Sequence, residues 1–272
     1  MTITTSERTR PMWQEHIAGR KIGLETGPRP FDPHKPCLLM VHGSGGRGET
    51  FRPQLSGLAP YLNPAAIDLP GHGNTPGPGR DQVAHYADWL AEFIRRGPLR
   101  PALLGHSLGG AIVMQLALDH PDLAPALVLV GTGSRLRVLP AILDGLLSDF
   151  DATLDLVLKY AYAPGADPRW VQAGREIMSQ PGPRVVHDDF AACDRYDITD
   201  RLGEITAPTL LIYGDQDQLT PPKYGRFLAE RLPDARLEIV AGAGHMVNLE
   251  RHAEVNRLIH PFISAFSPPA SS

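Results

Sequence analysis

The sequence contains few cysteines, no long apolar run and no apolar stretch near its first residue. Its two cysteines are Cys37 and Cys193. Residues 1–10, MTITTSERTR, lack the apolar segment of a signal peptide. Apolar runs such as ALVLV are far shorter than the roughly 20 residues that a membrane-spanning helix needs. We therefore expect a cytoplasmic protein with no membrane partner and two free thiols, although the sequence leaves a disulfide between them open.

Strong charge is also absent. The 272 residues carry a formal charge of −4, and no run of Lys or Arg interrupts them, so nothing in the sequence would attract nucleic acid or an anionic surface. No cluster of His, Cys and Asp has the spacing of metal ligands. We expect neither a metal nor another cofactor, and a small molecule as partner, whereas the oligomeric state is left open.

Short apolar runs bounded by Gly and Pro recur along the chain, separated by segments with helical periodicity. Besides these runs, edge strands are expected near the start of the chain, at 13–17 and 20–26. The pattern predicts an α/β fold: a mostly parallel central sheet of about eight strands with helices on both faces. The six apolar runs span residues 37–41, 65–68, 102–105, 126–131, 209–214 and 236–240.

Residues 134–205 break this alternation. They contain no strand-like run but four helical stretches, one of them introduced by Asp167 as N-cap and Pro168 in the first turn. We interpret this segment as a helical cap inserted after the sixth strand. The core domain would then consist of 1–133 and 206–272, with mobile ends at 1–10 and 267–272.

A glycine loop at residues 43–48, GSGGRG, matches G-x-G-x-x-G, and Asp68 follows twenty positions after it. In a dinucleotide site the helix begins within this loop, so that its first amides face the pyrophosphate. Pro53 would then lie inside the helix, at a cost of about 3 kcal/mol. We expect the helix to begin near Arg52 or Pro53 instead, with the glycines in a free loop.

A possible nucleophile lies in Gly105-His106-Ser107-Leu108-Gly109, which matches G-x-S-x-G between a strand run and a helical run. On such a sharp turn the serine hydroxyl projects above the sheet. The flanking glycines are needed because a Cβ there would collide with the neighbouring strand or helix. The context therefore favours a catalytic serine over an ordinary turn.

Serine becomes a good nucleophile when an imidazole accepts its proton and an acid orients that imidazole. Asp215 and Asp217 directly follow one strand run, and His245 follows the next in a glycine-rich loop. Parallel strands present their carboxyl ends at one edge of a sheet. Ser107, His245 and one of the two acids are therefore expected to meet there.

The chain resembles the α/β-hydrolase fold serine hydrolases, an esterase- and lipase-like family. The resemblance rests on LLMVHGSGG, DLPGHGNT, LLGHSLGG, PTLLIYGDQDQLTPP and GAGHMVNLE and covers about residues 13–266. It implies that Asp217, at the G-x-x-D position, is the acid of a catalytic triad. It also implies an oxyanion hole formed by the backbone N–H groups of Ser44 and Leu108.

The pocket of such an enzyme would lie between this edge of the sheet and the cap. His106 adjoins the nucleophile but is expected to point away from it. The aromatic and methionine side chains of the cap fit either the pocket or packing within the cap. Our candidates for the pocket are Gly43, His106, Phe150, Tyr160, Trp170, Met178 and Met246.

Several reactions fit these motifs. A serine at the elbow excludes the epoxide hydrolases and dehalogenases of this fold, which need an aspartate there. We expect a carboxylic ester hydrolase acting on small to medium, mainly apolar esters through an acyl-enzyme. An enol-lactonase remains open, as does a carbon–carbon bond hydrolase, although Gly46, His106 and Met246 depart from the pattern of the latter. A ligand-binding receptor on the same fold is the alternative from another class.

Overall fold

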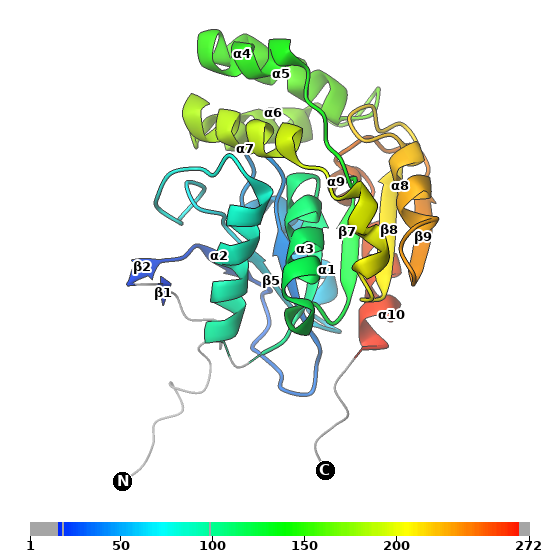
Figure 1. Ribbon diagram of the computed structural model, residues 1–272. Coiled ribbons are helices and arrows are strands. Elements are labelled where there is room, and N and C mark those ends of the chain that lie inside the picture. The colour runs from blue at the N-terminus through cyan, green and yellow to red at the C-terminus, as the bar shows by residue number, and fades with distance from the viewer. Residues whose placement is uncertain (1–15, 18, 98, 267–272) are drawn as a thin grey trace.

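The computed structural model describes residues 16–17, 19–97 and 99–266, and its central element is a seven-stranded sheet of order β3-β5-β4-β6-β7-β8-β9 (Figure 1). β3 pairs antiparallel to β5, and every other neighbouring pair is parallel. The predicted α/β class and the mostly parallel sheet are thereby confirmed. The strands are β3 (Leu24–Thr26), β4 (Cys37–Val41), β5 (Asn63–Ile67), β6 (Ala102–His106), β7 (Leu127–Val130), β8 (Thr209–Gly214) and β9 (Ala235–Val240).

The expected number of about eight strands was wrong. β1 (His16–Ile17) and β2 (Arg20–Lys21) pair with each other in a separate two-stranded sheet. Gly19 lies between them at φ +76°, a backbone conformation that glycine adopts without strain and that lets the chain reverse locally. Only β3 of this early segment joins the main sheet, and residues 13–15 of the predicted edge strand lie outside the described residues. The helical insertion therefore follows β7, the fifth strand of the main sheet in chain order, not a sixth.

Helices cover both faces of the sheet (Figure 1). The apolar side chains of β4 and β6 to β8 are buried because each face of these strands packs against a helical layer. One layer consists of α2 (Val83–Arg96), α3 (Leu108–Asp119) and α8 (Pro222–Ala229). The other consists of α1 (Arg52–Leu58), α9 (Val247–Glu250) and α10 (His252–Ser264). Within the described residues, no helix has the length and apolar character to cross a bilayer.

Four helices lie between β7 and β8, in the segment that the sequence marked as an insertion. They are α4 (Pro140–Ser148), α5 (Phe150–Ala161), α6 (Pro168–Ser179) and α7 (Pro183–Arg195), above one end of the sheet in Figure 1. The Asp167 side chain accepts a hydrogen bond from Arg169 N–H and so caps α6, as the sequence predicted. The short 3₁₀ helices are η2 (Gly48–Phe51), η3 (Pro121–Leu123) and η4 (Thr199–Glu204).

Close packing of two glycines fixes the turn between β6 and α3. A Cβ on Gly105 would collide with the backbone carbonyl of Gly109, and a Cβ on Gly109 would collide with the backbone carbonyl of Val41 in β4. These contacts involve main-chain atoms, which cannot move aside as a flexible side chain can. The absence of both side chains lets the first turn of α3 lie directly against the sheet.

We predict that Gly109→Ala destabilises the protein by at least about 2 kcal/mol, because the added methyl group must displace main-chain atoms of β4. Gly203→Ala in η4 is the matched control, since a Cβ at Gly203 meets no atom within 4 Å. Urea unfolding of both variants measures the difference. Equal stability of the two variants would contradict this account of the turn.

Candidate active site

The glycine loop does not open an α-helix, although the 3₁₀ helix η2 begins at its last glycine, Gly48. After β4 the chain forms a turn in which Gly46 N–H donates to the Gly43 carbonyl at 3.0 Å, and Gly45 has φ +65°. α1 begins only at Arg52, with Pro53 in its first turn, as expected from the sequence. Asp68, which a dinucleotide site would aim at a ribose, accepts hydrogen bonds from the N–H of Gly48 at 2.7 Å and of residue 74 at 2.8 Å. It joins two loops and leaves the dinucleotide interpretation without support.

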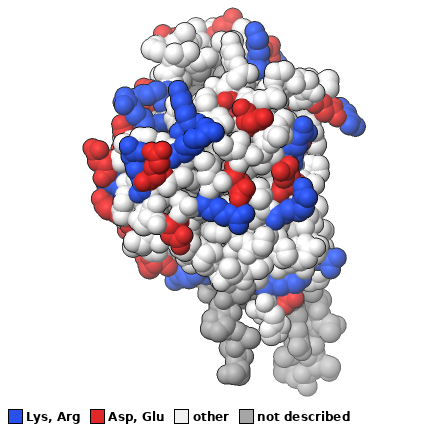
Figure 2. Space-filling view, turned by 90° about the vertical axis from the view of Figure 1, so that its right-hand side faces the viewer, with Lys and Arg blue, Asp and Glu red and all other residues white. Residues whose placement is uncertain are grey.

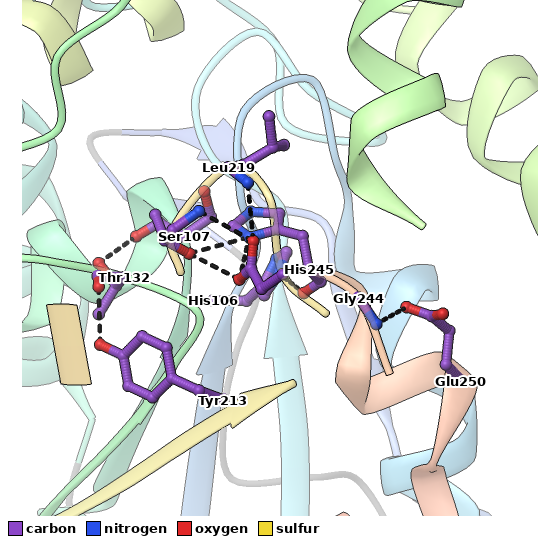
Figure 3. Close-up of polar contacts among 10 residues, drawn as sticks. His106, Ser107, Thr132, Tyr213, Leu219, Gly244, His245 and Glu250 are labelled. Atoms are coloured by element: carbon purple, nitrogen blue, oxygen red, sulfur yellow. Dashed lines mark hydrogen bonds and ion pairs between the residues drawn. The ribbon is translucent and has the colours of Figure 1, made fainter. Parts of the chain in front are cut away.

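Ser107 occupies the sharp turn between β6 and α3. It is the one non-glycine residue of the described chain with positive φ, at φ 53° and ψ −117°. Such a conformation is strained in an L-residue and persists only where its surroundings enforce it. Ser107 N–H donates to Val130, and its carbonyl accepts from Thr132 Oγ1 at 2.8 Å, while Tyr213 OH donates to the Thr132 carbonyl at 2.6 Å (Figure 3).

His245 and Asp217 lie at the ends of β9 and β8 and share a hydrogen bond of 2.9 Å between His245 Nδ1 and Asp217 Oδ2. Thr220 Oγ1 donates to the same carboxylate oxygen at 2.8 Å, and the N–H groups of Leu219 and Thr220 donate to Asp217 Oδ1. Burial acts to raise the pKa of Asp217, but the His245 charge and these hydrogen bonds outweigh it and hold the pKa below its ordinary value. The carboxylate therefore stays ionised and fixes the imidazole.

The other ring nitrogen, His245 Nε2, makes no hydrogen bond to a described residue, and neither does Ser107 Oγ. Both side chains line the same cavity of about 550 Å³, and Figure 3 shows them at the same edge of the sheet. A direct hydrogen bond between such groups often forms only when substrate binds. The arrangement leaves Nε2 available to accept the Ser107 proton.

Two backbone N–H groups, one in the turn after β4 and one next to Ser107, have no acceptor among the described residues. One belongs to Ser44, in the turn that follows β4, and the other to Leu108, the first residue of α3. Ser44 and Ser107 both line the cavity. Free amides at this place are suited to an oxygen that gains negative charge.

His106 points away from Ser107, towards the backbone of the loop that follows β9 and carries His245, here called the histidine loop. Its Nε2 lies 3.0 Å from the His245 carbonyl, and the two rings are 4.8 Å apart. Burial, followed by the neighbouring His245 charge, lowers the pKa of His106 to about 3, so this ring is neutral at ordinary pH. A neutral ring that donates to the His245 carbonyl supports the position of the loop.

The cavity is lined mostly by apolar side chains from the insertion. Phe150 requires a correction, since it does not line the cavity but packs within the insertion against neighbours that include Leu146 and Leu154. Its position at the start of α5 turns it towards α4, which the sequence pattern could not distinguish. Leu139 and Leu219 line the cavity and are partly exposed, and neither was expected there. The other proposed pocket residues all line it: Gly43, His106, Tyr160, Trp170, Met178 and Met246.

Two polar residues near Asp217 and His245 were missed from the sequence. Thr220 contacts both Asp217 and His245, and the spacing Asp-x-x-Thr after a strand could have indicated it, because this spacing allows a local side-chain turn. Glu250 accepts hydrogen bonds from Gly244 N–H at 3.0 Å and Ala163 N–H at 2.9 Å. It thereby ties the histidine loop to the end of α5. The contact with Ala163 had no sequence signal, since it joins residues 87 positions apart.

In the part of the chain that the structure describes, no three His, Cys, Asp or Glu side chains form a group that could hold a metal ion. Cys37 and Cys193 are free thiols. The expected disulfide alternative therefore does not apply to the described structure.

Comparison with known proteins identifies the family. Residues 36–252 match the model of the alpha/beta hydrolase fold family, and the chain belongs to that family. It is 32% identical to a pimeloyl-[acyl-carrier protein] methyl ester esterase of Chromobacterium violaceum over 82% of this chain and 92% of that protein. These findings confirm the resemblance to esterases of this fold and support the expectation of a carboxylic ester hydrolase.

Solved structures agree with this. A thermophilic esterase superposes with a TM-score of 0.81 at 35% identity, over 92% of this chain and 95% of the other. Est816, described as an N-acyl homoserine lactone degrading enzyme, superposes with a TM-score of 0.79 at 26% identity, over 91% of this chain and 99% of the other. The chain is thus similar both to an ester-cleaving and to a lactone-degrading protein.

The lowered pKa of Asp217 predicts a pH-dependent contribution to stability. Its ionised form stabilises the folded state at pH values above the ordinary pKa of 3.8, and this contribution is lost as the pH falls through the lower pKa of the folded state. We expect Asp217→Asn to destabilise the protein more at about pH 6 than at about pH 3. Urea unfolding of wild type and variant across this range, with the exposed Asp144→Asn as control, measures the effect. A constant difference would contradict it.

Proposed function

We propose that the protein is a serine hydrolase that cleaves carboxylic esters of small to medium, mainly apolar molecules. Ser107 is the nucleophile, His245 the general base and Asp217 the acid that orients it. The observation that carries this proposal is the 2.9 Å contact between Asp217 and His245 Nδ1, combined with a strained Ser107 at the same cavity. Each of these features has a structural cost that a simple binding protein would have no reason to maintain.

The chemistry follows from the positions of these groups. His245 Nε2 accepts the proton of Ser107 as Oγ attacks the ester carbonyl, and Asp217 stabilises the imidazolium that results. The carbonyl oxygen becomes negative and receives hydrogen bonds from the N–H groups of Ser44 and Leu108. The proton then passes from His245 to the departing alcohol. Water, activated in the same way, cleaves the acyl-enzyme and regenerates Ser107.

The insertion gives the proposed enzyme its substrate-binding surface. We propose that residues 134–205 act as a cap over a core formed by 1–133 and 206–272. Side chains of this segment, including Val157, Trp170 and Met178, line the cavity. Because this lining is mostly apolar, the free energy of binding would come mainly from apolar groups of the substrate that leave water.

The curated relative acts on a methyl ester attached to a carrier protein, but the cap of this chain favours a free ester. Residues 134–205 contain eight Lys and Arg against twelve Asp and Glu, a formal charge of −4. Cap arginines such as Arg137, Arg175 and Arg184 are paired with carboxylates of the same chain. Lys, Arg, Asp and Glu are also interspersed on the face drawn in Figure 2. Such a surface, which has no excess of positive charge, offers no electrostatic attraction to a negatively charged carrier protein.

Lactone hydrolysis is the second candidate, favoured by the similarity to the lactone-degrading Est816. A lactone is an internal ester, and the same three residues would open it. A panel of linear esters, enol-lactones and acyl homoserine lactones would separate the two substrate classes. Carbon–carbon bond cleavage has less support because Gly46, His106 and Met246 depart from the pattern of that group. A receptor would bind such compounds without turnover.

We predict that Ser107→Ala lowers kcat for p-nitrophenyl acetate and butyrate by about 10⁴-fold or more, because no other group supplies the nucleophile. Ser134→Ala is the matched control, since its buried hydroxyl contacts Thr199 and does not line the cavity. Spectrophotometric rates measure both variants. Unchanged turnover in Ser107→Ala would refute the assignment of the nucleophile.

The two neighbouring acids allow a second test. Asp217→Asn should lower kcat by about 10³- to 10⁴-fold, because the amide no longer fixes the tautomer and charge of His245. Asp215→Asn should retain most activity, since the exposed Asp215 side chain accepts from Gly242 N–H and makes no contact with His245. Ester turnover of the two variants distinguishes them. The reverse order would make Asp215 the acid of the triad.

A further inference from the structure

A buried carboxylate from α7 lies outside the proposed triad. Asp189 is fully buried, and its side chain has three polar partners from three other parts of the chain. Oδ2 accepts from Gly45 N–H at 2.8 Å and lies 3.0 Å from His72 Nε2, while Oδ1 accepts from Tyr86 OH at 2.6 Å. A carboxylate is costly to bury unless charges and hydrogen bonds compensate it, so this arrangement needs a reason.

His72 supplies the compensating charge. Burial acts to lower its pKa, but the charge of Asp189 and the hydrogen bond to it prevail, so the pKa of His72 is raised. Both ring nitrogens face acceptors, since Nδ1 lies 3.1 Å from the Pro70 carbonyl. The charge of Asp68 also favours the protonated ring. The ring of His42 lies 4.9 Å from that of His72. Asp189 and His72 therefore form a buried ion pair between the cap and the core.

The third partner, Gly45, connects this pair to the proposed oxyanion hole. Gly45 occupies the third position of the turn closed by Gly46 N–H and the Gly43 carbonyl, and its positive φ is the conformation that a type II turn requires there. Its N–H belongs to the peptide unit that joins it to Ser44. By accepting that N–H, Asp189 fixes the plane of this peptide. The neighbouring N–H, that of Ser44, is the one proposed to bind the oxyanion.

The same helix contacts this turn at a second point. Cys193 follows Asp189 by four residues, so both side chains lie on one face of α7. Cys193 Sγ is 3.7 Å from Ser44 Oγ, and α7 itself packs against α3, the helix that begins with Leu108. Two side chains of the cap therefore contact both residues of the Ser44–Gly45 unit and hold them in place.

We propose that Asp189, a residue of the cap, is a positioning residue. Its hydrogen bond to the Gly45 amide sets the orientation of the adjacent Ser44 N–H. The inference rests on the proposed function, because it concerns the oxyanion hole of that site. Its consequence is that the cap, besides lining the cavity, completes the catalytic geometry of the core. Since the oxyanion exists in the transition state and not in the bound ester, loss of this support should lower kcat and spare KM.

The test compares the same substitution at two adjacent residues. Asp189→Asn keeps the size of the side chain but leaves only one acceptor oxygen for the Gly45, His72 and Tyr86 donors. Asp188→Asn is the matched control, because Asp188 is also buried on α7 but contacts Arg184 and His187 instead. For p-nitrophenyl butyrate we expect Asp189→Asn to lower kcat by about 10- to 300-fold with KM within about threefold of wild type. Asp188→Asn should keep kcat within about threefold.

A merely structural role makes a different prediction. Tyr86→Phe removes the hydrogen bond to Oδ1 and leaves the one to Gly45 N–H, so it should lower the melting temperature while kcat stays within about threefold of wild type. Equal losses of kcat in Tyr86→Phe and Asp189→Asn, or a wild-type kcat in Asp189→Asn, would overturn the proposal. If Asp189→Asn does not fold, Asp189→Glu replaces it, since one added methylene displaces the carboxylate from Gly45. A wild-type kcat there would equally overturn the proposal.

The outcome is separable from that of the proposed function. Phosphonylation by a fluorophosphonate places an oxygen in the same oxyanion hole, and its rate is measured on each variant without ester turnover. A wild-type protein that is labelled but cleaves no ester would refute the proposed function alone. In that case the ratio of labelling rates of Asp188→Asn and Asp189→Asn, expected at about tenfold or more, still decides the role of Asp189.

Discussion

The site depends on the close approach of α3 to the sheet. Gly105 and Gly109 carry no side chain, so the first turn of α3 lies against the carbonyls that end β4. Ser107 lies in this turn at positive φ, and α3 begins with the next residue, Leu108. A larger residue at either glycine would push the helix outward and separate Ser107 from His245 and Asp217, which follow other strands. The conformational strain at Ser107 is thus maintained by main-chain packing, which changes less readily than side-chain contacts do.

Around this fixed turn, residues of several elements hold the polar side chains Asp217 and His245 in place. Backbone amides and Thr220 orient the Asp217 side chain. The His245 side chain is oriented by Asp217, and the His245 carbonyl contacts His106 Nε2. These partners limit the rotation of the Asp217 and His245 side chains. Preorganisation of this kind is what allows hydrogen bonds and charges to act on a transition state without first rearranging.

Much of this could be predicted from the sequence, because the relevant signals are local. Apolar runs gave the strands of the parallel sheet, Pro53 excluded a helix within the glycine loop, and G-x-S-x-G marked the elbow. The expected number of strands was wrong because β1 and β2, which lie in the segments expected as edge strands, pair with each other and do not join the main sheet. The assignment of Phe150 to the pocket was wrong for another reason, because its apolar side chain suits a cavity and a helix interface equally. Asp189 gave no signal at all, since its partners lie more than one hundred positions away in the chain.

The buried thiol of Cys193 has a practical consequence. It lies beside the proposed nucleophile's cavity, yet burial raises its pKa to about 12. At neutral pH little of this thiol is therefore present as the thiolate, the form that reacts with alkylating agents and oxidants. Alkylation of Cys193 by iodoacetamide, or its mild oxidation, would therefore report loss of the native fold around it.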